Sequence, residues 1–277
     1  MTTKRPLMPL LLAFGGLVAF VAVGCGGGGG GTGAECGNGV VEGSELCDDG
    51  TIPGTLATGA CTDVCTWQQF DPDTAGVGSG REPAVAMNAD GDFVIVWQAR
   101  DGSLGGERLD VFAAVYGANG SQRTPAFMVN QQTAVDQLYP SVGMDGEGRF
   151  VVAWYTWDEA GVTPPNLDNV SMRAYLPDGT PATDEIQVNT WTDGAHFRVQ
   201  VGVNDRGDLV ISWGNDGQDG DLTGVFAQLG DSGGNLAATA PFQVNTIITD
   251  AQENPHVGIS EAGDFVIAWE SKGQEAT

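Results

Sequence analysis

The apolar residues of this chain occur in short alternating runs, and the runs themselves recur at a fixed distance. Each of four runs starts with a large apolar residue and ends four residues later in a tryptophan. These tryptophans are spaced by 57, 59 and 56 residues: Trp97, Trp154, Trp213 and Trp269. A tandem unit of this length cannot bury its apolar face alone and must pack on its neighbours. The sequence therefore predicts a repeat architecture over residues 67–277.

Within each unit the apolar period is two, as in segments 83–87, 93–97 and 111–116. This alternation is typical of half-buried strands, and no helical stripe of useful length is present. A glycine two residues before each run, such as Gly91 or Gly148, suits a tight hairpin. With the F-x-V-N segment of the complete units, the pattern gives four strands per unit, as in a propeller blade. We expect an all-β, β-propeller-like array of four-stranded units, with a tandem sandwich or a solenoid as the alternative.

The chain does not contain a whole number of units, so the sequence does not show how a ring of blades would close. Residues 83–139, 140–198 and 199–254 make three whole units, and 255–277 is the first half of a fourth. Trp67 to Phe70 resembles the end of a preceding unit. Because closed propellers leave no unpaired strand edge, either this segment completes the last blade or the reading frame is truncated. The sequence favours truncation.

The four repeated tryptophans are expected to form the core of the units. Each indole can bury about 150–250 Å² of surface, so packing is a stronger reason for their recurrence than ligand binding. Trp157 and Trp191 fall outside the repeated positions, in expected loops. They are the better candidates for an aromatic platform that stacks on sugar rings, although partial packing is the simpler interpretation.

The charge balance excludes some partners. The 277 residues contain 11 basic and 36 acidic side chains, for a formal net charge of −25. Such a surface repels nucleic acid and anionic lipid. Solubility in an exposed compartment is the simple explanation, and affinity for cations or for a basic partner is the alternative.

The first residues indicate export. Lys4 and Arg5 precede an apolar stretch over 7–23, which is followed by Gly24 and Cys25. Residues 22–25 resemble the lipobox of bacterial lipoproteins. The resemblance implies that residues 1–24 are a signal peptide and that Cys25 becomes lipidated, so the membrane is a partner through acyl chains. An uncleaved membrane anchor and an ordinary signal peptide remain alternatives.

Residues 25–34 then form a glycine-rich tether with the flexibility to hold a domain away from the bilayer. Gly26 stands where aspartate acts as a retention signal in enteric lipoproteins. We therefore expect an outer-membrane or cell-surface location, facing the periplasm or the exterior.

Four cysteines lie within thirty residues, and none follows them: Cys36, Cys47, Cys61 and Cys65. Residues 35–66, with CGNGVVEGSELCDDG and then CTDVC, resemble the Myxococcus-type cysteine-rich repeat. A module this small needs cross-links in place of a large core, and an exported chain favours disulfides over zinc. Two disulfides are expected, and the sequence leaves all three pairings open.

The repeats are similar to a family found in large secreted bacterial proteins, with the pattern P-x-V-A-M-x-x-D-G-D-F-V-V-x-W. PAVAMNADGDFVIVW (83–97) and SWGNDGQDGDLTGVFAQ (212–228) carry this similarity best. The members are mostly uncharacterised, so the similarity supports architecture and an extracellular location and implies no activity.

One acidic loop could hold calcium. Asp216, Asp219 and Asp221 offer hard oxygen ligands separated by glycines. No segment satisfies the twelve-residue calcium loop with its terminal glutamate, and hairpin chemistry also explains such a loop. Calcium is the single cofactor that the sequence suggests.

Sequence signatures of common hydrolases are absent, including G-x-S-x-G and H-E-x-x-H. His196 and His256 lie near the start of new units, where turn or packing roles are expected. We therefore expect a non-enzymatic, surface-anchored domain that presents a binding face to a polysaccharide or protein ligand. A propeller-type carbohydrate-active hydrolase and a truncated product without an independent function are the alternatives.

Overall fold

The computed structural model describes residues 19–20, 69–70, 80–100, 108–118, 120–157 and 168–273. Cys25, the glycine tether and the cysteine-rich module lie outside these residues. Ala19–Phe20 (β1) pairs with Gln69–Phe70 (β2) in a short antiparallel ladder. The rest of the described chain is strand and turn, and it contains no helix.

Four antiparallel sheets follow one another along the chain, each with its strands in chain order. The first sheet contains β3 (Arg81–Met87), β4 (Phe93–Arg100), β5 (Leu109–Tyr116) and β6 (Phe127–Met128). The second contains β7 (Asp136–Met144), β8 (Phe150–Trp157), β9 (Val170–Tyr175) and β10 (Ile186–Gln187). The third contains β11 (His196–Val203), β12 (Asp208–Asp216), β13 (Thr223–Asp231) and β14 (Phe242–Gln243). The last has two strands, β15 (Gln252–Ile259) and β16 (Phe265–Ser271).

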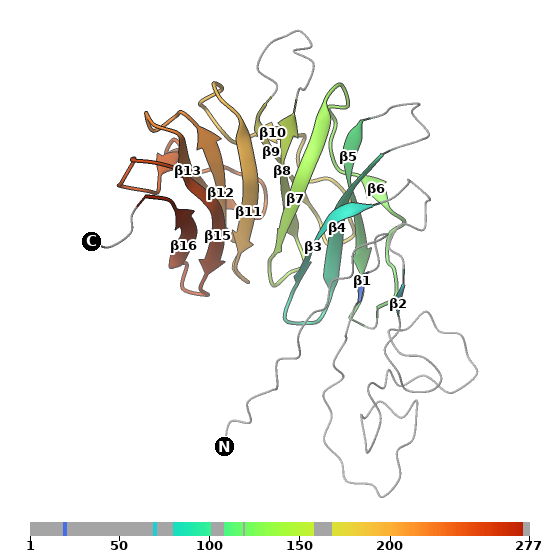
Figure 1. The fold of residues 1–277 in the computed structure, drawn as a ribbon. Coiled ribbons are helices and arrows are strands. Elements are labelled where there is room, and N and C mark those ends of the chain that lie inside the picture. The colour runs from blue at the N-terminus through green and yellow to red at the C-terminus, as the bar shows by residue number, and fades with distance from the viewer. Residues whose placement is uncertain are drawn as a thin grey trace, which may run out of the picture.

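The sheets stand side by side like the blades of a fan, from the first sheet to the last (Figure 1). The first strands of successive sheets contact one another: β3 meets β7, β7 meets β11, and β11 meets β15. The first strands therefore form the inner edge of the array, and the short fourth strands form the outer edge. The predicted all-β, propeller-like array of four-stranded units is confirmed.

Each sheet has two apolar faces, as its position between two neighbours requires. The forward face packs on the next sheet: Val94 and Val96 lie in one cluster with Met144 and Trp154 of the second sheet. The second sheet repeats the arrangement, with Val151 beside Trp213 of the third. We call the tryptophan-bearing side the rear face. Because successive side chains of a strand alternate between the two faces, both must be apolar in a stacked sheet.

Three of the four repeated tryptophans have no exposed surface, and the fourth differs. Trp97, Trp154 and Trp213 are 0% exposed, whereas Trp269 is 37% exposed. The third strand covers the indole in complete sheets, as the stacking of Phe112 on Trp97 at 6.2 Å illustrates. β16 has no third strand beside it in the described part of the chain. The expectation of four equivalent core tryptophans is therefore wrong for Trp269.

The asparagine of the F-x-V-N segment ties the fourth strand of each complete sheet to the third. The Oδ1 atoms of Asn130, Asn189 and Asn245 each accept a hydrogen bond, at 2.8 Å, from the backbone N–H of a valine on the third strand. All three side chains are buried. A side chain thus continues the backbone ladder where these two-residue strands end, which explains why the Val-Asn pair recurs.

Replacement of two equivalent tryptophans should have unequal effects. Trp154→Ala removes a buried indole whose Nε1 donates to Gln137 Oε1 at 2.7 Å, so we expect a loss of about 3–5 kcal/mol in the free energy of unfolding. Trp269→Ala should cost less than about 2 kcal/mol because the ring already contacts solvent. Urea unfolding of both variants measures the difference, and equal losses would contradict this account.

Candidate functional site

The inner strands share an irregularity at the same place in every unit. A register shift interrupts the first hairpin once in each sheet. At each shift a residue other than glycine has a φ between 49° and 56°: Glu82, Tyr139, Arg198 and Asn254. This conformation is rare for such residues and costs on the order of 1–3 kcal/mol. Backbone outliers that recur at one place are reasons to look there for a functional site.

Neighbouring sheets stabilise these bulges. The backbone N–H of Tyr139 donates to Oε1 of Gln98, on β4 of the preceding sheet, at 2.6 Å. Gln98 is buried. At this bulge the backbone N–H is therefore paired with a side chain of the preceding sheet.

Aromatic rings and a guanidinium group stack at the bulges of the second and third sheets. The Tyr139 and Tyr155 rings are parallel within 7°, with centroids 5.6 Å apart. The Arg198 guanidinium carbon lies 5.4 Å from the Tyr139 ring centroid, within the range of a cation–π contact. No carboxylate in the described part of the chain forms an ion pair with Arg198.

Two carboxylates influence the same group of side chains. Burial, with smaller contributions from Tyr139 and from the charges of Asp168 and Glu82, raises the pKa of Tyr155 to about 12, and the charge of Arg198 opposes this rise. The Tyr155 phenol is therefore protonated at neutral pH and can donate a hydrogen bond. We call these five residues, contributed by three sheets, the inner-strand cluster: Glu82, Tyr139, Tyr155, Asp168 and Arg198.

A polar pocket of about 440 Å³ is lined by the connection that follows β6 and by residues of the second sheet, including its third and fourth strands. Its walls include Thr156 and Asn169, and Thr156 lies on the opposite face of β8 from Tyr155 because successive strand residues alternate between faces. Glu185 also lines it and accepts hydrogen bonds from the backbone of Gln131 and Gln132 at 2.8 and 3.1 Å. Amide, hydroxyl and carboxylate groups of this kind can pair with the hydroxyls of a sugar.

The two tryptophans outside the repeat are partly exposed near this pocket. Trp157 is 38% and Trp191 is 42% exposed. The Trp191 carbonyl accepts a hydrogen bond from Nδ2 of Asn189 at 2.7 Å, and the same Nδ2 donates to Oδ1 of Asn169 in the pocket wall at 3.2 Å. The structure therefore leaves apolar ring surface accessible close to polar groups.

The proposed calcium ligands are occupied by loop hydrogen bonds. Asp219 Oδ2 accepts from Asn245 Nδ2 at 2.9 Å, and Asp221 Oδ2 accepts from the backbone of Asp250 at 3.0 Å. Asp216 lines a different hollow, of about 460 Å³, together with Lys272. Among the residues that the structure describes, no group of three His, Cys, Asp or Glu side chains is arranged to hold a metal ion. Asp216, Asp219 and Asp221 are therefore not brought together as a metal site.

His196 occupies a structural position. Its equivalents in the neighbouring units are Gln137 and Gln252, and all three side chains are buried. Nε2 of His196 lies 3.2 Å from Nδ2 of Asn215, and burial lowers the pKa of the imidazole. His256 is exposed on β15. Neither position belongs to the inner-strand cluster.

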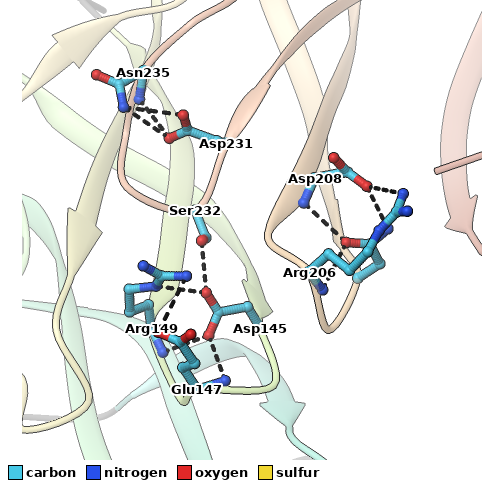
Figure 2. A network of polar contacts seen from close by, with 9 residues as sticks. Asp145, Glu147, Arg149, Arg206, Asp208, Asp231, Ser232 and Asn235 are labelled. Carbon is cyan, nitrogen blue, oxygen red and sulfur yellow. Dashed lines mark hydrogen bonds and ion pairs between the residues drawn. The ribbon is translucent and has the colours of Figure 1, made fainter. Parts of the chain in front are cut away.

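The most buried carboxylate, Asp145, also has a structural role. Figure 2 shows Asp145 Oδ2 accepting hydrogen bonds from Nε of Arg149 at 2.7 Å and from Oγ of Ser232 at 2.6 Å. Oδ1 accepts from the backbone of Glu147 and Arg149. The hydrogen bond to Asp145 is the main reason that the pKa of Arg149 is raised. With both oxygens paired at the hairpin end of β7, this carboxylate fastens the second sheet to the third.

The inner-strand cluster was missed in the sequence, although a signal for it exists. Glu82, Tyr139 and Asn254 each directly precede the proline that opens a unit, and Arg198 precedes the equivalent Val199. The strands repeat from unit to unit, whereas the side chain at this position differs in charge and size in each unit. Such a difference indicates that this position does not serve the repeated packing alone. The positive φ at this repeated position is visible only in three dimensions.

No protein family profile matches the sequence, and no curated protein matches it. Several solved structures resemble the chain in fold. An endo-arabinase from Bacteroides thetaiotaomicron shares 13% identity at a TM-score of 0.47, covering 76% of this chain and 79% of that one. An α-L-arabinanase from Penicillium chrysogenum shares 11% at 0.47, covering 75% and 60%. A family 117 glycoside hydrolase from Zobellia galactanivorans shares 16% at 0.41, covering 64% and 59%.

The chain spans less than two thirds of the last two proteins, and identities this low bear on the fold alone. All three are named as carbohydrate-active enzymes. The expectation of a non-enzymatic binding domain is contradicted by these resemblances and has to be corrected.

Substitution of His196 tests its structural role. Because burial lowers the pKa of His196 below 6.5, the unfolded chain binds a proton at a higher pH than the folded chain does. The free energy of unfolding should therefore fall as the pH decreases below about 6.5. His196→Gln introduces the residue found at the equivalent positions and should lessen this fall.

The measurement is the difference in unfolding free energy between about pH 7.5 and about pH 5. His256→Gln is the matched control and should leave that difference as in the parent chain. An unchanged pH dependence in His196→Gln would show that burial of this imidazole does not govern acid stability.

Proposed function

We propose that this chain is a propeller-type carbohydrate-active hydrolase whose reaction centre is the inner-strand cluster. The observation that carries the proposal is that Glu82, Tyr139 and Arg198 lie at strained bulges of three successive inner strands, and that the charges of Glu82, Asp168 and Arg198 all act on the Tyr155 phenol. Three sheets contribute these groups, so the fold itself assembles them. Cleavage of a glycosidic bond needs two carboxyl groups with different roles.

The cluster contains groups suited to each role. Glu82 and Asp168 are the candidate pair of carboxyl groups, one to protonate the leaving oxygen and one to act on the opposite face of the sugar. The protonated phenol of Tyr155 can donate a hydrogen bond to a substrate oxygen. The Arg198 guanidinium lies over the Tyr139 ring and has N–H donors that can pair with a substrate oxygen.

The surroundings support a saccharide as the substrate. The amide and hydroxyl groups of the pocket on the second sheet offer both donors and acceptors. Trp157 and Trp191 expose ring faces close by, and aromatic faces pack well on the apolar side of a sugar ring. Polar groups that fix orientation beside apolar surface are typical of small-molecule sites.

A carboxylate substitution tests the proposal directly. The purified chain should release reducing ends from at least one member of a polysaccharide panel that includes arabinan. Glu82→Gln should lower that rate by about 100-fold or more, because an amide cannot transfer the proton. Circular dichroism of the variant confirms that the fold is retained, since the Glu82 side chain is exposed.

Glu147→Gln is the matched control, because Glu147 is also exposed but lies at the hairpin end of β7. It should keep the parental rate. Absence of activity on every polysaccharide, or equal rates for Glu82→Gln and Glu147→Gln, would refute this assignment.

We propose, from the sequence, that the enzyme works while anchored to a membrane through lipid on Cys25. Residues 22–25 support this by their resemblance to a lipobox. Within the segments that the structure covers, no helix is long and apolar enough to cross a bilayer. The four cysteines of the cysteine-rich module are proposed to form two disulfides that separate the anchor from the sheets.

Metabolic labelling with a palmitate analogue tests the anchor. The parent chain should take up the label, and Cys25→Ser should lose it because the sulfur that accepts the acyl group is gone. Cys36→Ser is the control and should remain labelled. Label retained in Cys25→Ser would place any acyl group elsewhere.

A further inference from the structure

The arginines of the described chain differ in their pairing between the two ends of the sheets. The strands β3, β7, β11 and β15 begin at one end, which we call the entry end. The turns that join them to the next strands lie at the other, hairpin end. Three arginines of the hairpin end each form an ion pair with a carboxylate: Arg123, Arg149 and Arg206. Since the chain has 36 acidic and 11 basic residues, a carboxylate partner is the ordinary expectation for a basic side chain.

Three arginines of the entry end depart from this expectation. Arg81 begins β3, Arg100 ends β4, and Arg198 lies near the start of β11. All three are exposed, and none forms an ion pair within the described part of the chain. The first strand of a hairpin begins where the antiparallel second strand ends, so all three belong to the entry end.

These arginines are placed near the Tyr139 bulge by two neighbouring sheets. Arg81 is paired with Gln98 in the first hairpin, and Arg100 is two residues beyond Gln98 on the same face of β4. Gln98 Oε1 accepts the hydrogen bond from the Tyr139 backbone N–H at 2.6 Å. From the third sheet, the Arg198 guanidinium carbon lies 5.4 Å from the Tyr139 ring centroid. Basic side chains of the first and third sheets therefore approach the same bulge of the second.

Carboxylates at the entry end of the first two sheets are directed to other partners. Asp110 Oδ1 accepts a hydrogen bond from Asn130 Nδ2 at 2.8 Å, and Asp136 Oδ1 accepts one from the backbone of Leu109 at 2.8 Å. Glu82 follows Arg81 in the sequence but forms no ion pair with a residue that the structure describes. The guanidinium N–H groups are thus available to a ligand.

The chemistry of these groups indicates the charge of the ligand. A guanidinium group is positively charged at any ordinary pH, and its planar set of N–H donors matches the oxygens of a carboxylate or sulfate. The hydroxyls of a neutral sugar pair equally well with the amides and hydroxyls already found in the polar pocket. Three unpaired arginines on an acidic chain are therefore explained by an anionic ligand and not by a neutral one.

We propose that the polysaccharide bound at the inner-strand cluster carries carboxylate or sulfate groups, which Arg198 binds together with Arg81 and Arg100. The inference rests on the proposed function for the saccharide and adds charge as the feature that is recognised. Because the second sheet separates the first from the third, the two sets of arginines hold charged groups of different sugar residues. An acidic oligosaccharide should therefore bind more tightly than its monosaccharide.

Isothermal titration calorimetry of the purified chain tests this site without relying on catalysis. The probes are an oligogalacturonide, which carries carboxylates, a carrageenan oligosaccharide, which carries sulfates, and a neutral arabinan oligosaccharide. At least one of the two acidic probes should bind more tightly than the arabinan probe. Addition of about 0.5 M salt should weaken that binding, because salt screens exposed charges.

Arginine substitutions locate the binding. Arg198→Gln should weaken the acidic probe about 10-fold or more, because a charge-assisted pair of hydrogen bonds is lost. Arg81→Gln and Arg100→Gln should each weaken it in the same direction. Arg206→Gln is the matched control: it removes the same charge from an exposed side chain at the hairpin end and should leave the affinity unchanged. Circular dichroism of each variant checks that the fold is retained.

Several results would overturn the proposal. These are tighter binding of the arabinan probe than of both acidic probes, no binding of either acidic probe, or equal affinities for Arg198→Gln and Arg206→Gln. An oligonucleotide of equal charge that binds as tightly would show a general polyanion surface instead. Cleavage of arabinan without acidic binding would refute this inference and leave the proposed hydrolase function intact. Arginine-dependent acidic binding with no cleavage of any polysaccharide would support this site and refute the hydrolase function.

Discussion

The packing of one sheet's rear face on the forward face of the sheet before it is the interaction on which the whole structure depends. A four-stranded sheet with two apolar faces is not stable in water alone, because half of its alternating side chains would face solvent whichever way it turned. Stacking buries both faces at once. Val94 against Met144 and Trp154, and Gly143 against Val203, show how large and small residues are matched across this contact.

This constraint also sets the place where chemistry can vary. The apolar positions of the strands are committed to the sheet contacts, and the repeated asparagines and Asp145 are committed to hydrogen bonds that join strands and sheets. Of the bulge residues of the inner strands, Tyr139 packs against a core cluster, whereas Glu82, Arg198 and Asn254 belong to none of the described core clusters. Glutamate, tyrosine, arginine and asparagine therefore occupy one repeated position, and the convergence of the inner strands gathers three of them with Tyr155 and Asp168.

The packing of one sheet on the next explains which sequence-based expectations were confirmed and which were wrong. The alternation of apolar residues and the spacing of the tryptophans are local properties, so the strands and the four-stranded units could be read directly. The exposure of Trp269 could not, because it depends on whether a third strand lies beside β16. The sequence predicted a turn or packing role for His196. It did not show that His196 and the residues at the equivalent positions, Gln137 and Gln252, are all buried, because burial depends on the fold.

The sequence by itself determined the repeat, its period, the strand content of each unit and the acidic character of the chain, because these depend on residue order and composition alone. The tertiary structure decided which faces are covered, which carboxylates meet and which do not. Glu82 and Arg198 are 116 residues apart in the chain, and only the stacking of the sheets lets the charges of both act on the Tyr155 phenol. Asp219 and Asp221 are close in the chain, but their Oδ2 atoms accept hydrogen bonds from different partners, Asn245 and the backbone of Asp250.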